Sequence, residues 1–213
     1  MCSSRSPFIC FILCLSLGLL LPTQGQAKSK NFAYKGFTGG MFLHTGYVQS
    51  KPFPIIVKEG ITLQQQIKGV PIGIGGKLAL LFGNHWRFGM EGYASSVRYG
   101  STRSAFKIGW GGLLVEYIYP IQRYVPFVTL TLGGGGAKNM ILLEKTKDDF
   151  TPLSVVYREY GFMAITPSLG CEFLMSKKMK IVLKADYLFS PTQEPDFASG
   201  FRIYLGFLFN NMR

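Results

Sequence analysis

The sequence predicts an all-β fold: an eight-stranded antiparallel up-and-down transmembrane β-barrel preceded by a cleaved signal peptide. Three observations lead to this prediction. Apolar and polar residues alternate with a period of two along extended segments, which is the period of a β-strand. Tight turns and longer polar loops alternate between these segments, as in antiparallel membrane barrels. An apolar run close to Met1 has the position and length of an export signal.

The N-terminal segment decides which solvent the mature chain meets. Met1 to Arg5 carry one positive charge, residues 8–21 are apolar, and Gly25-Gln26-Ala27 place small residues where a signal peptidase cuts. We therefore expect residues 1–27 to be a cleaved signal peptide and residues 28–213 to form the barrel domain. An uncleaved anchor is the alternative, but the run is shorter than the roughly 18 residues of a spanning helix.

Composition supports one folded, basic domain. With 47% hydrophobic and 15% aromatic residues, the chain is too apolar for a disordered protein. After cleavage, 22 basic and 11 acidic residues leave a net charge of +11. In an exported protein this charge favours lipid phosphate over nucleic acid as the anionic neighbour. Cys171 becomes the last remaining cysteine, so no internal disulfide is expected.

Eight segments have the strand period, and each has at least the roughly 9 to 11 residues that a tilted strand needs to cross a bilayer. They are residues 34–47, 70–82, 86–98, 105–119, 124–138, 160–175, 179–190 and 198–209. Tight turns are expected at 83–85, 120–123 and 176–178, and longer loops at 48–69, 139–159 and 191–197. An even number of strands places both chain ends at the rim of the tight turns, on the periplasmic side.

Aromatic residues fall near both ends of the predicted strands, as in the two interface girdles of membrane barrels. The alternative is that Tyr and Phe simply favour strands. The expected turn-side girdle is Tyr34, Trp86, Tyr117, Tyr119, Tyr124, Phe173 and Phe209, and the expected outer girdle is Tyr47, Tyr99, Tyr187, Phe189 and Phe201.

The polar side of each strand predicts the barrel interior. Eight strands enclose a lumen just wide enough for side chains, and an unpaired buried charge costs several kcal/mol, so cations and anions should pair there. We expect a structural polar network and a closed barrel, with a proton or ion path as the alternative. The expected set has four cations and four anions: Lys77, Arg87, Glu91, Glu116, Glu172, Lys184, Asp186 and Arg202.

Two strands depart from this pattern. Pro167 lies inside the sixth strand, where it cannot donate to a ladder, so we expect a bulge near Thr166 that reverses the register beyond it and affects the side taken by Glu172. The fourth strand alternates poorly, because Phe106 and Trp110 share the parity of its acidic residue.

Neither a cofactor nor a metal ion is expected. Gly133 to Gly136 are followed by Ala137 and Lys138 without the Ser or Thr of a phosphate-binding loop, and glycines more often relieve crowding in a barrel. His44 is expected near the outer end of the first strand and His85 in a turn. Opposite rims would prevent the two histidines from sharing a metal.

Together, the signal peptide, eight amphipathic strands, short inner turns and aromatic last strand resemble the small outer-membrane barrels, namely OmpA-like transmembrane domains and OmpX-like proteins. Phe201, Ile203, Leu205, Phe207 and Phe209 keep the spacing of that family's assembly signal, although residues 210–213 follow where the family usually ends on Phe. Such tails resemble those of Bacteroidota barrels. The resemblance implies a Gram-negative outer membrane, with its lipids, lipopolysaccharide and barrel assembly machinery as partners.

The leading functional hypothesis is a non-enzymatic outer-membrane barrel whose long loops contact the outside. Basic residues at this rim would lie near lipopolysaccharide phosphates or simply be solvated: Lys51, Lys58, Lys68, Arg98 and Arg103.

Two alternatives remain. A lipid A-modifying enzyme of the acyltransferase or deacylase type would need His44 with Ser101 or Ser104 and with Asp148 or Asp149, a combination that rests on no motif. A soluble periplasmic barrel of lipocalin type would turn its apolar parity toward an internal cavity.

Overall fold

The computed structural model describes residues 32–56, 62–100, 104–142, 155–176, 178–192 and 194–212. The predicted signal peptide, residues 1–27, lies outside this part of the chain and remains a prediction. Among the described residues, no helix is long and apolar enough to cross a membrane.

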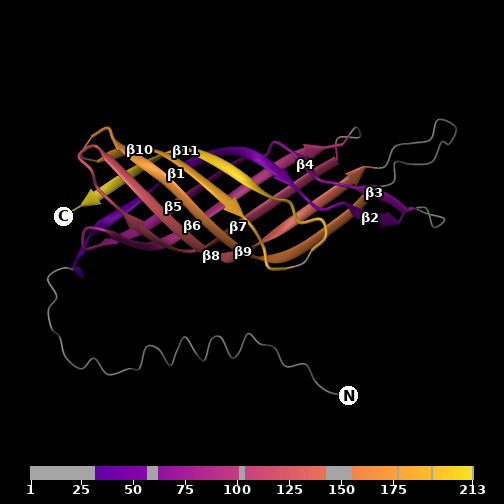
Figure 1. Cartoon of the computed structure of the whole chain (residues 1–213), viewed down its shortest axis with the longest axis horizontal. Coiled ribbons are helices and arrows are strands. Elements are labelled where there is room, and N and C mark those ends of the chain that lie inside the picture. The colour runs from indigo at the N-terminus through magenta and orange to yellow at the C-terminus, as the bar shows by residue number, and fades with distance from the viewer. Residues whose placement is uncertain are drawn as a thin grey trace, which may run out of the picture. The chain divides into compact units, whose positions relative to one another are not determined.

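Eight long antiparallel strands follow one another around a closed sheet, slanted relative to the long axis of the barrel (Figure 1). The predicted all-β, eight-stranded up-and-down architecture is therefore confirmed. The strands are β1 (Tyr34–Gln49), β5 (Ile72–Phe82), β6 (Trp86–Tyr99), β7 (Ser104–Ile118), β8 (Tyr124–Leu142), β9 (Val155–Leu174), β10 (Met179–Leu188) and β11 (Ser199–Met212).

Closure comes from the pairing of the first and last long strands. β1 and β11 pair from Gly36 opposite Met212 to Gln49 opposite Ser199 without a break in register. Since each long strand pairs on both sides, the sheet satisfies its backbone hydrogen bonds internally, and closure removes the edges.

Tight turns connect the strands at one end, here called the turn end, where β1 also begins and β11 ends. Gly83 has a φ of 59° and Gln122 a φ of 51°, the left-handed conformation that reverses the chain in few residues. The opposite end, the loop end, carries the connections β1–β5, β6–β7, β8–β9 and β10–β11.

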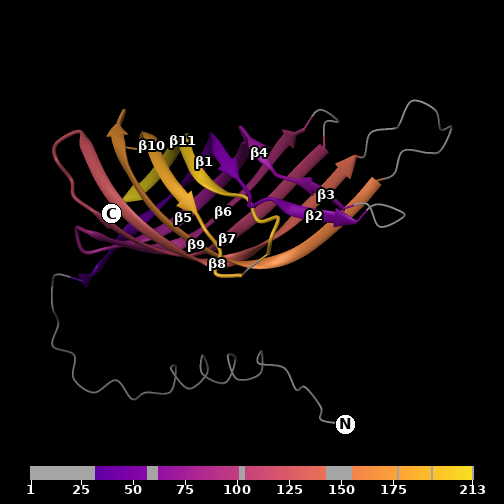
Figure 2. The same cartoon turned by 45° about the vertical axis from the view of Figure 1, so that its right-hand side comes forward.

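The segment 48–69 was predicted to be a polar loop, and this prediction is wrong. It contains a hairpin of β2 (Phe53–Ile56) and β3 (Thr62–Gln65) and a short strand, β4 (Lys68–Gly69), that pairs with the end of β1. Figures 1 and 2 show the hairpin at the loop end. Phe53 and Ile67 are fully buried, so the segment has an apolar anchor that its polar composition concealed.

The predicted loop 139–159 is also shorter than expected. β8 and β9 continue past their predicted ends and pair up to Leu142 opposite Val155. The charged residues assigned to this loop, Glu144 to Asp149, lie outside the described part of the chain.

The bulge predicted near Thr166 does not form. β8 and β9 keep one register from end to end, with Pro167 opposite Leu130. On the other side, the β9–β10 ladder stops at Ser168 opposite Asp186 and resumes as a bridge between Ile165 and Phe189, in the same register. Ile165 donates to and accepts from Phe189, so the nitrogen of Pro167, two residues on, faces the same gap. Pro167 has no N–H donor, and the β9–β10 ladder accommodates this by a local interruption at that position.

The two faces of the sheet differ as expected for lipid outside and charge inside. The outer wall carries leucines that are more than half exposed, among them Leu43, Leu113, Leu183 and Leu205. The charged side chains at the alternate strand positions are buried in the lumen. The lipocalin-type alternative required the reverse orientation, and the structure contradicts it.

Candidate functional site

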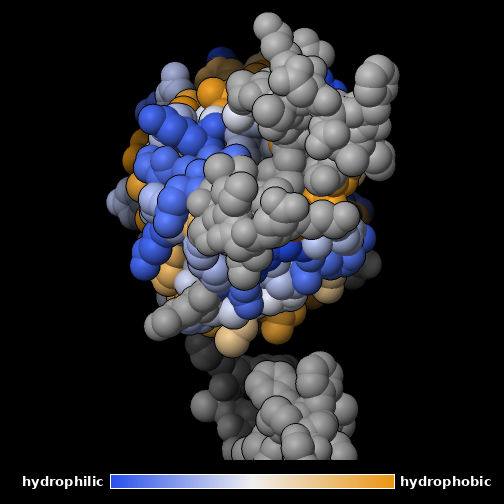
Figure 3. Space-filling model, turned by 90° about the vertical axis from the view of Figure 1, so that its right-hand side faces the viewer, coloured by the Kyte–Doolittle hydropathy of each residue, from blue (hydrophilic) through white to orange (hydrophobic). Residues whose placement is uncertain are grey.

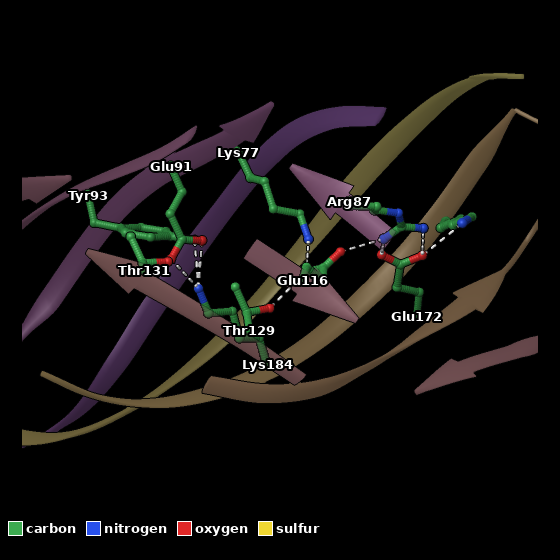
Figure 4. A network of polar contacts seen from close by, with 10 residues as sticks. Lys77, Arg87, Glu91, Tyr93, Glu116, Thr129, Thr131, Glu172 and Lys184 are labelled. Carbon is green, nitrogen blue, oxygen red and sulfur yellow. Dashed lines mark hydrogen bonds and ion pairs between the residues drawn. The ribbon is translucent and has the colours of Figure 1, made fainter. Parts of the chain in front are cut away.

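The charged residues at the turn end form one connected group, here called the turn-end cluster: Lys77, Arg87, Glu116, Glu172 and Lys180 (Figure 4). Lys77 donates to Glu116 over 2.7 Å, and Arg87 donates to Glu116 over 2.7 Å and to both carboxylate oxygens of Glu172. Lys180 donates to Glu172 over 2.7 Å. None of these five side chains is more than 5% exposed.

These ion pairs cross the lumen. Arg87 lies on β6 and Glu172 on β9, two strands that are separated by β7 and β8 in the ring. Lys77 on β5 likewise reaches past β6 to Glu116 on β7. The cluster therefore ties different walls of the barrel together and occupies the space between them.

A second pair, Glu91 with Lys184, lies deeper in the lumen and is here called the middle pair. Lys184 donates to both carboxylate oxygens of Glu91, over 3.0 and 2.8 Å, and to the Tyr93 hydroxyl over 3.2 Å. The hydroxyls of Thr131 and Tyr93 also donate to Glu91. This carboxylate thus accepts hydrogen bonds from three side chains on β6, β8 and β10.

Asp186 and Arg202 are direct neighbours across β10 and β11, but within the described part of the chain they form no ion pair. The Arg202 guanidinium instead lies 4.5 Å from the ring centroid of Trp110, a cation–π contact from across the lumen. The eight predicted interior residues are therefore all buried, and six of them are joined by ion pairs.

His44 does not lie at the outer rim, as the sequence analysis expected. It is 3% exposed, inside the barrel, with its ring 4.8 Å from that of Tyr204 and 5.6 Å from that of Trp110. The expectation failed because it considered how far along the strand His44 lies and not which face of the sheet its side chain takes. It shares the inward parity of Phe42 and Val48.

The poor alternation of the fourth strand has a structural cause. Phe106, Ile108 and Trp110 all point into the lumen and are at most 5% exposed. The part of β7 nearer the loop end therefore contributes aromatic and apolar side chains to the interior. Tyr99, predicted for the outer girdle, also faces inward and donates to Asn139 over 2.6 Å. The ion pairs of the turn-end cluster lie toward the other end of the lumen, whereas Arg202 lies beside Trp110.

The loop-end mouth is covered by residues that the sequence analysis treated as a plain loop. Phe197 packs against Phe162 with ring centroids 4.9 Å apart, and Asp196 is fully buried. Asn139 donates to Asp196 over 3.2 Å, and Arg158 lies 3.5 Å from the same carboxylate. Among the described residues, segment 194–198 thus supplies an apolar and an acidic contact at this mouth.

Sequence reasoning missed Lys180. It is 2% exposed and has the same parity as Lys184 and Asp186 on β10, which was the available signal. With Lys180, the strands bury five cations and four anions, so the predicted balance of interior charge is not exact.

The residues proposed for catalysis are not brought together by the described structure. Ser104 is buried at the start of β7, and Ser101, Asp148 and Asp149 lie outside the described residues. Among the described residues, no group of three or more His, Cys, Asp or Glu could hold a metal ion.

No protein-family model and no curated protein sequence matches the chain. Solved structures do match. Neisserial surface protein A (NspA) is 14% identical, with a TM-score of 0.53 over 83% of this chain and 98% of that chain. Ail, the attachment invasion locus protein of Yersinia pestis, is 15% identical, with a TM-score of 0.48 over 83% of this chain and 99% of that chain.

The N-terminal β-barrel domain of Pseudomonas aeruginosa OprF is 9% identical, with a TM-score of 0.45 over 84% of this chain and 100% of that chain. At these identities a likeness concerns the fold. The match to NspA shows that this chain and a small bacterial surface protein share one barrel architecture.

Proposed function

We propose that the chain is a non-enzymatic integral protein of the bacterial outer membrane, exported by a signal peptide cleaved near Ala27. The observation that carries this proposal is the orientation of the side chains. Apolar side chains cover the outside of a closed sheet while ten charged side chains are buried. A protein folded in water would bury the apolar row instead, whereas hydrocarbon favours this arrangement.

The aromatic residues support the same placement. Tyr34, Trp86 and Tyr124 are exposed on the outer wall at the turn end, and Tyr47 and Phe201 at the loop end. Amphipathic rings of this kind favour the two head-group levels of a bilayer. Figure 3, which looks onto the loop end, has hydrophilic residues gathered on this face and hydrophobic ones toward its margin.

The barrel is proposed to be closed to ions and solutes. Ion pairs that join β6 to β9 and β6 to β10 span the lumen, and the aromatic residues of β7 fill space between these pairs and the loop end. Opening a path would leave some of these charges unpaired, which costs several kcal/mol for each ion.

The loop end is proposed to face the outside of the cell and to contact lipopolysaccharide. Lys51, Lys68 and Arg98 are exposed there, whereas Lys58 and Arg103 lie outside the described residues. Exposed cations at the head-group level attract lipid phosphates. The barrel assembly machinery is the proposed folding partner, as the family resemblance implies.

Cell fractionation followed by gel electrophoresis tests this proposal. We expect the chain in the outer-membrane fraction, with faster migration before boiling than after it, because a folded barrel resists detergent. Planar bilayers that contain the purified barrel should show no ion conductance. Recovery in the soluble periplasm with unchanged migration would refute membrane insertion, and steady conductance would refute closure.

The enzyme alternative has its own test. In cells that carry His44→Ala, we expect an unchanged pattern of lipid A acylation, because the ring of His44 lies within an aromatic cluster inside the lumen. Loss of an acyl modification in this variant, with the barrel still folded, would establish catalysis.

A further inference from the structure

A cavity of about 560 Å³ lies at the turn end of the barrel. Three cations from the described part of the chain line it: Arg87 and Lys180 are buried members of the turn-end cluster, and Lys35 is exposed. Asn84 and Asn210 contribute amide groups, while no Asp or Glu lines the cavity among the described residues.

The turn-end cluster carries an excess of positive charge. Lys77, Arg87 and Lys180 face two carboxylates, Glu116 and Glu172, so the buried group has a net charge of +1. The middle pair is neutral by itself and does not compensate. A buried net charge is unfavourable unless a counter-ion is bound or the solvent reaches it.

Arg87 and Lys180, two residues that line the cavity, have hydrogen-bond donors without partners. The Nε of Arg87 is buried and has no partner, although both terminal nitrogens of its guanidinium are engaged. Lys180 has three donors and uses one, toward Glu172. A buried N–H group is normally paired with an acceptor, and the excess positive charge favours an acceptor that is an anion.

We propose that this cavity binds a small oxyanion, a phosphate or carboxylate group, which accepts from Arg87 and Lys180 and neutralises the turn-end cluster. The apolar side chains of Leu81, Ile118 and Val125 line the same cavity and lower the local dielectric, which strengthens each charged contact. The site does not depend on the membrane placement proposed above. In that placement it opens to the periplasm.

The direct test titrates the full barrel, folded in octyl glucoside micelles that contain neither phosphate nor carboxylate. Inorganic phosphate and acetate are added separately at constant ionic strength, with chloride as the background anion. The readouts are the ¹⁵N–¹H resonance of Arg87 Nε and calorimetric affinity. A saturable shift with phosphate, acetate or both supports the site and identifies the oxyanion. No shift with either anion overturns it.

Variants separate a binding site from a purely structural cluster. Lys180→Met removes the excess charge and the whole ammonium donor group, so binding should weaken about tenfold or more. Glu172→Gln removes the anion that competes for the same donors, so binding should become at least about threefold tighter. A structural role alone would make both variants less stable and neither a better binder. Glu172→Gln without tighter binding would therefore overturn the proposal.

Lys178→Gln is the matched control, because Lys178 is exposed at the same end and does not line the cavity. It should bind both anions like the unchanged protein. An equal loss in this variant would show general attraction to a basic rim and overturn the site. If Lys180→Met does not fold, Lys35→Gln changes an exposed residue of the cavity and should weaken binding about threefold.

Discussion

Replacing Lys184 with methionine tests how much the middle pair contributes to the barrel. Methionine has nearly the same length and shape, so the packing of the side-chain stem is retained while the charge is removed. Glu91 would keep the hydroxyl donors of Thr131 and Tyr93, but it would lose the two hydrogen bonds from Lys184. Breaking a buried ion pair from one side costs about 3–5 kcal/mol, because the other charge stays buried.

A double variant separates the value of the pair from the cost of an orphaned charge. Glu91→Gln with Lys184→Met removes both charges and leaves an amide that the two hydroxyls can still contact. Replacing a buried pair with neutral groups is often close to neutral, so the double variant should be more stable than Lys184→Met by about 2 kcal/mol or more.

The assay is equilibrium unfolding in urea from lipid vesicles, followed by tryptophan fluorescence. The chain has two tryptophans, so a Trp86→Phe background leaves Trp110, whose ring lies 5.6 Å from that of Tyr93. A cost below about 1 kcal/mol for Lys184→Met would mean that water reaches Glu91 and that the lumen is not closed. A double variant no more stable than the single one would refute the ion-pair reasoning.

Three further predictions follow from the two faces of the sheet and from the loop end. Leu205→Arg, on the outer wall in the middle of β11, should cost about 2–4 kcal/mol in vesicles, against about 0–1 for Met140→Arg near the loop end; equal costs would contradict lipid contact. Gly133→Ala should cost about 1–3 kcal/mol, whereas Gly136→Ala should be tolerated. A methyl group at position 133 would lie 2.0 Å from the Gly111 carbonyl oxygen, whereas one at position 136 would lie 3.8 Å from the Tyr160 carbonyl oxygen, its nearest contact beyond the adjacent residues. Equal unfolding midpoints would contradict the assigned faces. Phe53→Ser should speed protease cleavage within segment 48–69 without changing the heat-dependent gel shift, because it removes a fully buried anchor of the β2–β3 hairpin and leaves the barrel intact; an unchanged cleavage rate would show that the anchor is dispensable.

The barrel itself could be predicted because the strand period is a local property. Leu183 and Ala185 alternate with Lys184 and Asp186 whatever the rest of the chain does, and closure follows once eight such strands exist. The errors arose where long-range contacts override local composition. Phe53 and Ile67 anchor a segment that reads as polar, and Pro167 is tolerated by a ladder gap that no local rule for proline specifies.

The alternation of the strands pointed to eight charged residues that the structure buries, but it missed Lys180 and could not give their pairing. Parity assigns a side chain to the lumen, whereas its height and its partner depend on the stagger summed around the ring. Glu91 and Lys184 are 93 positions apart and meet only because the four successive strand registers from β6 to β10 bring them to one level. Asp186 and Arg202, the cross-strand neighbours that the sequence would pair first, form no such contact among the described residues. Side chains in a narrow barrel stand away from their own sheet, so the opposite wall, here Trp110, determines the contact that Arg202 makes.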